Sequence, residues 1–247
     1  MNPGPEAPQQ EPVAASLETD AATEPSRPRG GPSWLLLGGV ALLVMLLVRG
    51  FLVQSFYVPS GSMEPTIEPG DRILVNKLAD GDAVRRGDVV VFDGTTSFAA
   101  ADRTPHQDDG AIGKVLGDAA SVVGIDLGEQ DFVKRVIGLP GDHVVCCDDR
   151  GRLTLNGKAV DEPYLMPGDD PSDLEFDITV PAGRLWVMGD HRSDSADSRS
   201  HLGDPGGGTV RLSDVIGRAT ATYWPLSRLG RFERPSAFAQ VPAAGEP

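Results

Sequence analysis

The chain has 247 residues, which allows one sizeable domain with appendages or two small domains. Acidic residues outnumber basic residues by 36 to 22, and the net charge of −14 argues against nucleic acid as a partner, because phosphate binding requires a basic surface. The two cysteines, Cys146 and Cys147, are adjacent and therefore supply neither a disulfide framework nor the ligand spacing of a metal site.

Both ends of the chain lack the large apolar residues that a core requires. The first 32 residues contain seven prolines together with alanine and glutamate, and the residues after 232 have a similar composition. Segments of this kind cannot bury enough apolar surface to offset the entropy lost on ordering. We therefore expect disordered tails over residues 1–33 and 233–247.

A long apolar run follows the first tail. Residues 34–48, WLLLGGVALLVMLLV, carry no charge, and continuation to Val53 gives about the 20 residues that a transmembrane helix needs, with Arg49 near one end. A buried core helix and a cleavable signal peptide are the alternatives. The signal peptide would need a small-residue cleavage site, whereas the run leaves through QSFYV at residues 54–58. We predict an uncleaved transmembrane anchor over residues 34–55.

The basic residues around this run predict its orientation. Arg27 and Arg29 precede it, and after Arg49 no basic residue occurs before Arg72. Because positive charge is retained in the cytoplasm, the pattern favours a cytoplasmic N-terminus. We expect a single-pass protein of the cell membrane whose main domain, residues 56–232, lies outside the cytoplasm.

Short runs rich in β-branched and aromatic residues recur through this domain, separated by Gly, Pro and Asp, and predict strands. They are residues 72–76, 88–92, 131–137, 143–147, 175–180, 185–188 and 215–222. The pair Asn156-Gly157, between LTL and KAV, suits a type I′ turn and predicts a hairpin. Many short strands and few helical periods indicate a mainly β domain.

Residues 94–130 form an insertion of different character. Apolar residues in it fall at helical spacing, namely Ile112, Val115, Leu116, Ala119, Val122 and Val123. A helix packed on the sheet and a surface for membrane or substrate contact are both compatible with this pattern.

A serine flanked by glycine and bracketed by prolines follows the apolar run, in PSGSMEPT at residues 59–66. Ser62 would lie on a rigid, irregular backbone, as an exposed nucleophile requires, although serines in ordinary turns are common. None of the four histidines has a distinctive setting as its base, and the common hydrolase motifs G-x-S-x-G, S-x-x-K and H-E-x-x-H are absent.

A lysine offers an alternative base for this serine. Of the four lysines, Lys134 alone lies in the middle of a predicted strand, where period-2 alternation places it on one face with Phe132 and Val136. Apolar neighbours desolvate an ammonium group and lower its pKa, which makes a lysine usable as a base near neutral pH. The alternative is a lysine that extends from an edge strand into solvent.

The chain resembles the bacterial type I signal peptidases (leader peptidases), in particular the single-span form. Four blocks carry the resemblance in the family's order: the anchor followed by PSGSMEPT at 59–66, RGDVVVF at 86–92, FVKRVIGLPGD at 132–142, and GDHRSDSADSR at 189–199. The resemblance implies a serine protease with a Ser–Lys dyad, built as a mainly β catalytic domain of barrel-like sheets and tethered by one N-terminal helix.

The resemblance also implies roles for individual residues. Ser62 would be the acylated nucleophile and Lys134 its general base. The oxyanion hole would consist of the Ser62 backbone N–H and the Ser60 hydroxyl, and Ser195 would orient the Lys134 amine. A neutral amine needs such a partner to direct its lone pair, and a hydroxyl can serve without adding charge.

In the last block, Asp190, Asp197 and Arg199 would hold the loop together, with Asp190 acting through Arg135. His191, Ser193 and Asp194 replace the family's usual Asn, Asp and Asn, which affects local loop contacts. Asp194 and Asp197 would also suit a carboxylate pair or a calcium site, but the block lacks the glycine and terminal glutamate of an EF-hand, and we expect no metal.

For a signal peptidase, the substrates are secretory preproteins with small residues one and three positions before the cut, presented at a membrane lipid surface. No cofactor is expected. A shallow apolar groove would bind the signal peptide, lined by Phe56, Val58, Met63, Ile67, Ile73, Val91, Phe132 and Val133, although such residues resemble ordinary core.

Two other functions remain as alternatives. A self-cleaving repressor shares the Ser–Lys chemistry, but it would carry a DNA-binding module where this chain has an apolar run. A membrane-anchored β-domain that only binds partners would need no buried lysine, and its function would survive the change Ser62→Ala.

Overall fold

The computed structural model describes residues 33–79, 83–98 and 131–245. The expected N-terminal tail up to residue 32 and the helical pattern within residues 99–130 lie outside the described part of the chain. Contacts divide the chain into two compact units, Met1–Val40 and Ala41–Pro247, and every strand belongs to the second.

The apolar run forms one helix, α1 (Ser33–Phe51), of 19 residues. Its described large apolar side chains are exposed, with Trp34 at 69% and Leu36 at 71%. In the described part of the chain, no helix combines the length and apolarity needed to cross a membrane. The predicted anchor extended to residue 55, but the helix ends at Phe51. Val53–Tyr57 forms a strand instead, because Phe56 enters the core of the domain.

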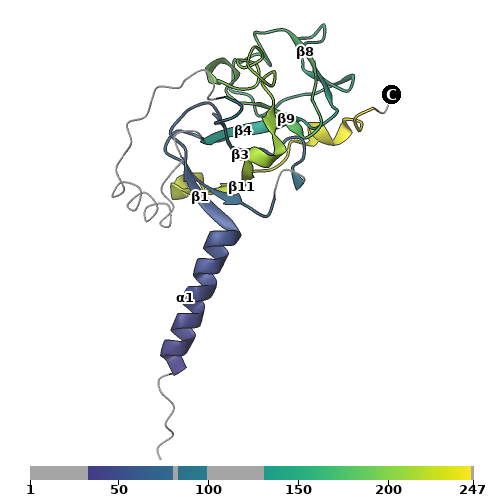
Figure 1. Ribbon diagram of the computed structural model, residues 1–247. Coiled ribbons are helices and arrows are strands. Elements are labelled where there is room, and N and C mark those ends of the chain that lie inside the picture. Colours follow the sequence, from purple (N-terminus) through teal and green to yellow (C-terminus); the bar gives the residue numbers. More distant parts are fainter. Residues whose placement is uncertain (1–32, 80–82, 99–130, 246–247) are drawn as a thin grey trace, which may run out of the picture. The chain divides into compact units, whose positions relative to one another are not determined.

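The larger sheet has eight strands in the described residues, all paired antiparallel, in the order β1-β2-β11-β3-β4-β9-β10, with β12 paired to β11 (Figure 1). Its strands are β1 (Val53–Tyr57), β2 (Arg72–Asn76), β3 (Val89–Asp93), β4 (Asp131–Gly138), β9 (Arg184–Met188), β10 (Val210–Arg211), β11 (Val215–Trp224) and β12 (Gly230–Arg231). Short 3₁₀ turns occur in the connections: η2 (Arg192–Asp194), η3 (Leu212–Asp214), η4 (Leu226–Arg228) and η5 (Ser236–Gln240).

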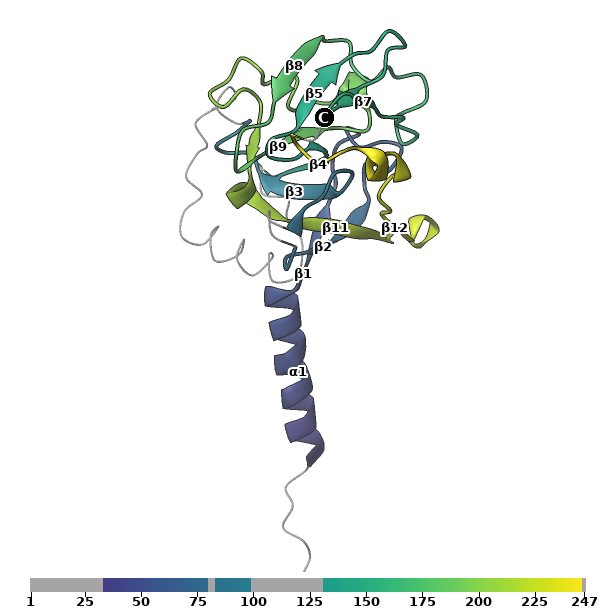
Figure 2. The same cartoon turned by 90° about the vertical axis from the view of Figure 1, so that its right-hand side faces the viewer.

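The smaller sheet has four strands in the order β7-β6-β5-β8. They are β5 (His143–Cys146), β6 (Thr154–Leu155), β7 (Lys158–Ala159) and β8 (Phe176–Thr179), and Figure 2 shows β5, β7 and β8 beyond β9 and β4 of the larger sheet. The predicted hairpin is confirmed: β6 and β7 pair across Asn156 and Gly157, whose φ angles of 49° and 76° are those that a type I′ turn requires.

Strand alternation distributes the core over both faces of the larger sheet. On one face Val89, Val91 and Val133 pack in a cluster with Phe56 and Met63 from the segment that begins with β1. On the other face the alternate residues of the same strands pack in a second cluster, which includes Val90, Phe92 and Val136. A third cluster fills the space between β4, β9 and the smaller sheet, around Trp186. This central, doubly covered position makes β4 a rigid support for Lys134.

Each of the seven predicted strands is present within two residues of its predicted bounds, which confirms the mainly β class. Three strands were not predicted, namely β1, β10 and β12. The first is apolar and continuous with the preceding run, and the other two have only two residues each.

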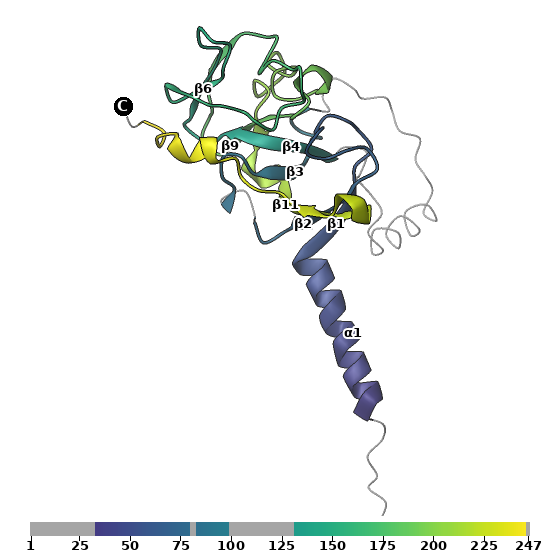
Figure 3. The ribbon, with the colours of Figure 1, turned by 180° about the vertical axis from the view of Figure 1, so that it is seen from behind.

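The C-terminal segment differs from the expectation of a disordered tail. Residues 233–245 are described; η5 and the residues after it pack on the domain, with Phe238 and Val241 buried in the third cluster (Figure 3). Arg86 anchors the segment further by donating to the Val241 and Pro242 carbonyls. Two buried apolar side chains and the hydrogen bonds from Arg86 thus hold a stretch whose overall composition is typical of disorder.

The adjacent cysteines, Cys146 and Cys147, whose redox state the sequence leaves open, are joined by a disulfide. The bond closes no loop between distant segments. It lies at the end of β5, where Cys146 packs in the third cluster.

Candidate active site

The serine motif forms a tight turn between β1 and β2. The Glu64 N–H donates to the Gly61 carbonyl oxygen at 2.9 Å, and the Ile67 N–H donates to the Met63 carbonyl oxygen at 2.9 Å. The side chains of Met63 and Ile67 are fully buried, at 1% and 0% exposure. They belong to the apolar cluster that contains Phe56 of β1 and Val133 of β4, the cluster under β1. This apolar anchoring fixes the backbone of Ser62, whose side chain stays at the boundary of the core.

Lys134 lies opposite this turn on β4. Its side chain is 3% exposed, and its Nζ is hydrogen-bonded to Ser62 Oγ at 2.7 Å. Burial lowers the pKa of Lys134 to about 8, although the carboxylates of Asp197, Asp190 and Asp194 act in the opposite direction. A substantial fraction of such an amine is neutral near physiological pH, so it can accept a proton from the adjacent hydroxyl.

Ser60 lies on the same turn as Ser62. Its Oγ is 3.5 Å from Ser62 Oγ. A second hydroxyl therefore lies beside Ser62 Oγ, near the position where the carbonyl oxygen of a bound substrate would become an oxyanion and need a hydrogen-bond donor.

The block at residues 189–199 forms the loop after β9 and carries buried charges that are paired. Arg135 donates to both carboxylate oxygens of Asp190, at 2.8 and 2.6 Å, and Thr66 donates to the same carboxylate at 2.5 Å. Arg135 follows Lys134 on β4 and Thr66 belongs to the serine turn. Asp190 thus connects the base strand to the nucleophile turn.

Asp197 forms hydrogen bonds with other residues of the same loop. It accepts two hydrogen bonds from the Arg199 guanidinium and one from the Gly189 N–H. Although burial alone would raise the pKa of Asp197, these donors hold it below its ordinary value. The described residues contain no cluster of three or more potential metal ligands.

Two supporting residues were missed by the sequence analysis. Glu162 forms a buried ion pair with Arg192 at 2.5 Å, and it accepts the Tyr164 hydroxyl hydrogen bond at 2.5 Å. The Tyr164 ring lies 4.2 Å from the Arg135 guanidinium carbon, in a cation–π contact. Their only signal in the sequence is EPY between two predicted strands, which has no feature of a site.

Ser195 stands apart from the other residues of the loop. Its Oγ is buried and has no hydrogen-bond partner in the described part of the chain. A Cβ added at Gly189 would overlap both the Ser195 side chain and the Ser62 carbonyl oxygen. Glycine at position 189 therefore allows the loop to approach the nucleophile turn closely, with the Ser195 hydroxyl in the same contact region.

The expected groove residues are largely brought together. Seven of the eight belong to the cluster under β1, namely Phe56, Val58, Met63, Ile67, Ile73, Val91 and Val133. The eighth, Phe132, packs at the edge of the cluster on the opposite face. The seven are at most 6% exposed, so they form core in this structure.

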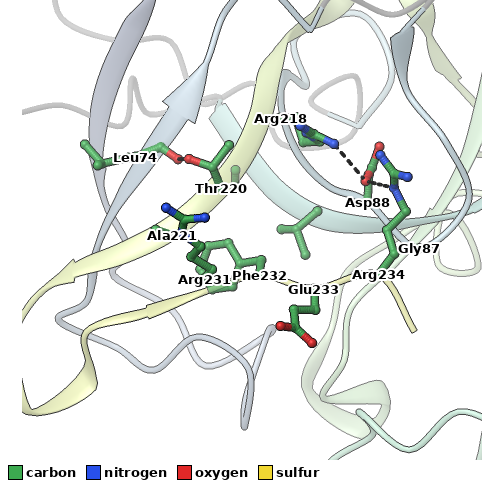
Figure 4. A pocket seen from close by; sticks show the side chains of 12 residues that line it. Leu74, Gly87, Asp88, Arg218, Thr220, Ala221, Arg231, Phe232, Glu233 and Arg234 are labelled. Atoms are coloured by element: carbon green, nitrogen blue, oxygen red, sulfur yellow. Dashed lines mark hydrogen bonds and ion pairs between the residues drawn. The ribbon is translucent and has the colours of Figure 1, made fainter. Parts of the chain in front are cut away.

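A cavity of about 680 Å³ lies elsewhere on the domain, beside β11 (Figure 4). Asp88 in its wall accepts Arg234 at 2.5 Å and also faces Arg218 at 3.6 Å, so its charge is already paired. Neither Ser62 nor Lys134 lines this cavity. The reactive pair therefore lies outside this cavity.

These groups together can perform nucleophilic hydrolysis. The Ser62 hydroxyl lies 2.7 Å from a buried amine with a lowered pKa and 3.5 Å from a second hydroxyl. The ion pairs of the neighbouring loop fix this geometry. The arrangement needs no metal or cofactor for proton transfer from the nucleophile.

Comparison with known proteins identifies the family of this chain. A sequence model of the family described as signal peptidase, peptidase S26, matches residues 32–224. A probable signal peptidase I of Mycobacterium leprae is 37% identical over 235 residues, which cover 84% of this chain and 81% of that protein. A signal peptidase I of Mycobacterium tuberculosis is 39% identical over 216 residues, covering 79% of this chain and 73% of that protein. The crystal structure of a signal peptidase I from Enterococcus faecalis covers 55% of this chain and 95% of that chain, with 24% identity and a TM-score of 0.34.

Proposed function

The chain belongs to the bacterial type I signal peptidases, the peptidase S26 family, and we propose that it removes signal peptides from exported preproteins with Ser62 as nucleophile and Lys134 as general base. As a member of this family it is a serine endopeptidase. The single observation that supports the two assignments most strongly is the 2.7 Å separation of Lys134 Nζ and Ser62 Oγ in a buried setting.

In the acylation step, the neutral Lys134 amine takes the proton of the Ser62 hydroxyl as the oxygen attacks the carbonyl carbon of the scissile bond. The tetrahedral intermediate collapses when the protonated lysine returns a proton to the leaving amine. The signal peptide is then an ester on Ser62, and the mature protein departs. The lowered pKa of Lys134 supports this role, because an ordinary lysine would be charged and could not accept the proton.

Deacylation repeats the sequence with water in place of serine. Lys134 takes a proton from water, which attacks the ester, and the proton returns to Ser62 Oγ as the signal peptide is released. In both steps the negative oxygen would receive hydrogen bonds from the Ser62 N–H and the Ser60 hydroxyl. The 3.5 Å separation of the two serine hydroxyls supports the second donor.

Ser195 is proposed to orient the Lys134 amine. Ser195 Oγ makes no hydrogen bond to Lys134 Nζ in this structure; the support for the role is that its hydroxyl is buried without a partner and that its side chain borders the position where a Gly189 side chain would meet the Ser62 backbone. A buried hydroxyl without a partner is costly, and an approach of the neutral amine would satisfy it.

We further propose that signal peptides with small residues one and three positions before the cut lie along the cluster under β1. Phe56, Val58 and Met63 flank Ser62 in sequence and are apolar, which supports a groove for apolar residues. Because these side chains are buried against one another in this structure, substrate binding would require them to move apart.

Finally, we propose that α1 tethers the protein to the cell membrane as a single-pass anchor with the N-terminus in the cytoplasm. Its uncharged stretch and its exposed apolar side chains support this role, because such a surface is unfavourable in water. Membrane lipid would then be a partner, and a tether would raise the local concentration of membrane-bound preproteins.

The decisive assay compares the full chain with Ser62→Ala, both purified in detergent, on a preprotein substrate. Release of a mature product with a new N-terminus by the wild type alone is expected. Equal cleavage by both proteins would reject Ser62. If Ser62→Ala cleaves nothing but binds preproteins as the wild type does, Ser62 is needed for catalysis and not for binding. This result distinguishes a protease from a domain that only binds partners.

A further inference from the structure

His191 contacts the nucleophile turn at two points. Its backbone N–H donates to the Ser62 carbonyl oxygen at 3.2 Å, and its ring Nδ1 lies 3.3 Å from the Gly61 carbonyl oxygen. A carbonyl only accepts hydrogen bonds, so Nδ1 must carry the proton of this contact. The ring is partly buried and also faces the Glu64 carboxylate, 3.7 Å away.

The Gly61 carbonyl belongs to the same peptide group as the Ser62 N–H. A trans peptide is planar, and its C=O and N–H point in opposite directions. A donor that holds the Gly61 oxygen therefore also fixes the direction of the Ser62 N–H. The Glu64 N–H already occupies one side of this oxygen at 2.9 Å, and the His191 ring supplies a second donor. Both donors also polarise the peptide group, which strengthens its N–H as a donor.

We propose that His191 is a positioning residue for the reaction: its ring N–H holds the Gly61–Ser62 peptide group so that the Ser62 N–H faces the developing oxyanion. This inference rests on the proposed function, because the oxyanion forms only in the reaction proposed at Ser62. It assigns no chemistry to the ring itself. The carbonyl that His191 holds and the N–H that it directs lie on opposite edges of one peptide plane. Both neutral histidine with the proton on Nδ1 and the imidazolium ion can provide the donor.

Three substitutions at position 191 separate the donor from the bulk of the ring. Asparagine places an N–H₂ near the position of Nδ1, glutamine places it near the position of Nε2, and leucine fills the space without a donor. His143 provides the control, because its ring is exposed on the smaller sheet and pairs with Asp177. His143→Leu should leave all parameters unchanged.

The test measures kcat and KM of the full chain in detergent on a soluble signal-peptide substrate, together with the inhibition constant of a peptide aldehyde that adds to Ser62 as a tetrahedral adduct. We expect His191→Leu to lower kcat by about 3- to 10-fold, the factor expected from one neutral hydrogen bond, with KM unchanged. Aldehyde binding should weaken by a similar factor, because the adduct carries the same oxyanion. His191→Asn should restore kcat to within about two-fold of the wild type, and His191→Gln should not.

Wild-type kcat in His191→Leu would overturn the proposal, as would equal restoration by glutamine and asparagine. If asparagine fails while the protein keeps the wild-type melting temperature, the Gly61 contact is not what matters and the proposal is also rejected. The Ser62→Ala variant runs in parallel. Cleavage that persists there would reject the proposed nucleophile itself, which distinguishes that failure from a failure of His191.

Discussion

Lys134 Nζ and Ser62 Oγ lie 2.7 Å apart although 72 residues separate them in sequence. The contact forms because the serine turn is anchored in the core by Met63 and Ile67 while β4 passes opposite it, paired with β3. Each group is held by a different part of the fold, so their approach reflects the packing of the whole domain.

Removal of the Ser60 hydroxyl should slow the reaction without weakening substrate binding. Loss of one oxyanion donor costs roughly 10²- to 10³-fold in turnover, because the donor acts on charge that develops only in the transition state. Ser60→Ala should therefore lower kcat by about this factor and leave KM near the wild-type value. Ser213→Ala, in η3, is the control, because this serine is exposed and, among the described residues, its hydroxyl contacts only Asp214. An unchanged kcat in Ser60→Ala would remove Ser60 from the oxyanion hole.

The acid limb of the pH–rate profile should reflect the protonation of Lys134. Because burial lowers the pKa of this amine to about 8, kcat/KM should rise with pH and level off above this value. The Asp194 carboxylate favours the ammonium form, so Asp194→Asn should move the limb to lower pH. Asp177→Asn, on the smaller sheet, should leave the limb in place. A limb that shifts to higher pH in Asp194→Asn would contradict the electrostatic account of Lys134.

Lys134 should reduce the stability of the fold. Unfolded lysine holds its proton to a pKa of 10.5, whereas the folded residue releases it at about 8. Between these values the unfolded chain binds more protons, so stability rises with pH there, and below about 8 the full cost remains. Lys134→Met should therefore raise the free energy of unfolding at pH 7 by about 3 kcal/mol.

Denaturant titration of the variant in detergent measures this gain, with Lys158→Met on exposed β7 as the control. The gain should shrink as the pH rises from 8 towards 10.5. A variant that is less stable than the wild type at pH 7 would show that the amine is accommodated without cost.

Deletion of residues 1–51 should leave a folded and active domain. The cut keeps Leu52, whose carbonyl oxygen accepts the Lys77 N–H, and all of β1, which pairs with β2. We expect normal cleavage of soluble peptides and slower cleavage of preproteins in lipid vesicles, because the tether is lost. If the truncated protein cleaves both substrates at the wild-type rates, α1 has no anchoring role.

The sequence predicted the strands more successfully than the boundaries between regions. Alternating β-branched runs and Asn156-Gly157 depend on local geometry, so they can be read without knowledge of the fold. By contrast, β1 was merged with the apolar run before it, because Phe56 is apolar whether it faces lipid or the core. The burial of Phe238 and Val241 depends on a surface formed by distant strands, which composition does not describe.

The site could be predicted only in part for the same reason. The apolar neighbours of Lys134 on its strand indicated a lowered pKa, and the resemblance pointed to Ser62. No local pattern marks Tyr164 or Glu162, whose contacts with Arg135 and Arg192 arise from a loop between other strands. Groove and core residues share one chemistry, so the sequence has no means of distinguishing them.

The central claim is that Lys134 acts as a base, and the activity of Lys134→Arg tests it most directly. Arginine keeps the positive charge but does not lose its proton at any accessible pH, so it cannot accept the Ser62 proton. Turnover of a signal-peptide substrate by the full chain in detergent should fall to the level of Ser62→Ala. Substantial turnover by Lys134→Arg would show that position 134 supplies only charge, and the Ser62–Lys134 dyad would then be wrong.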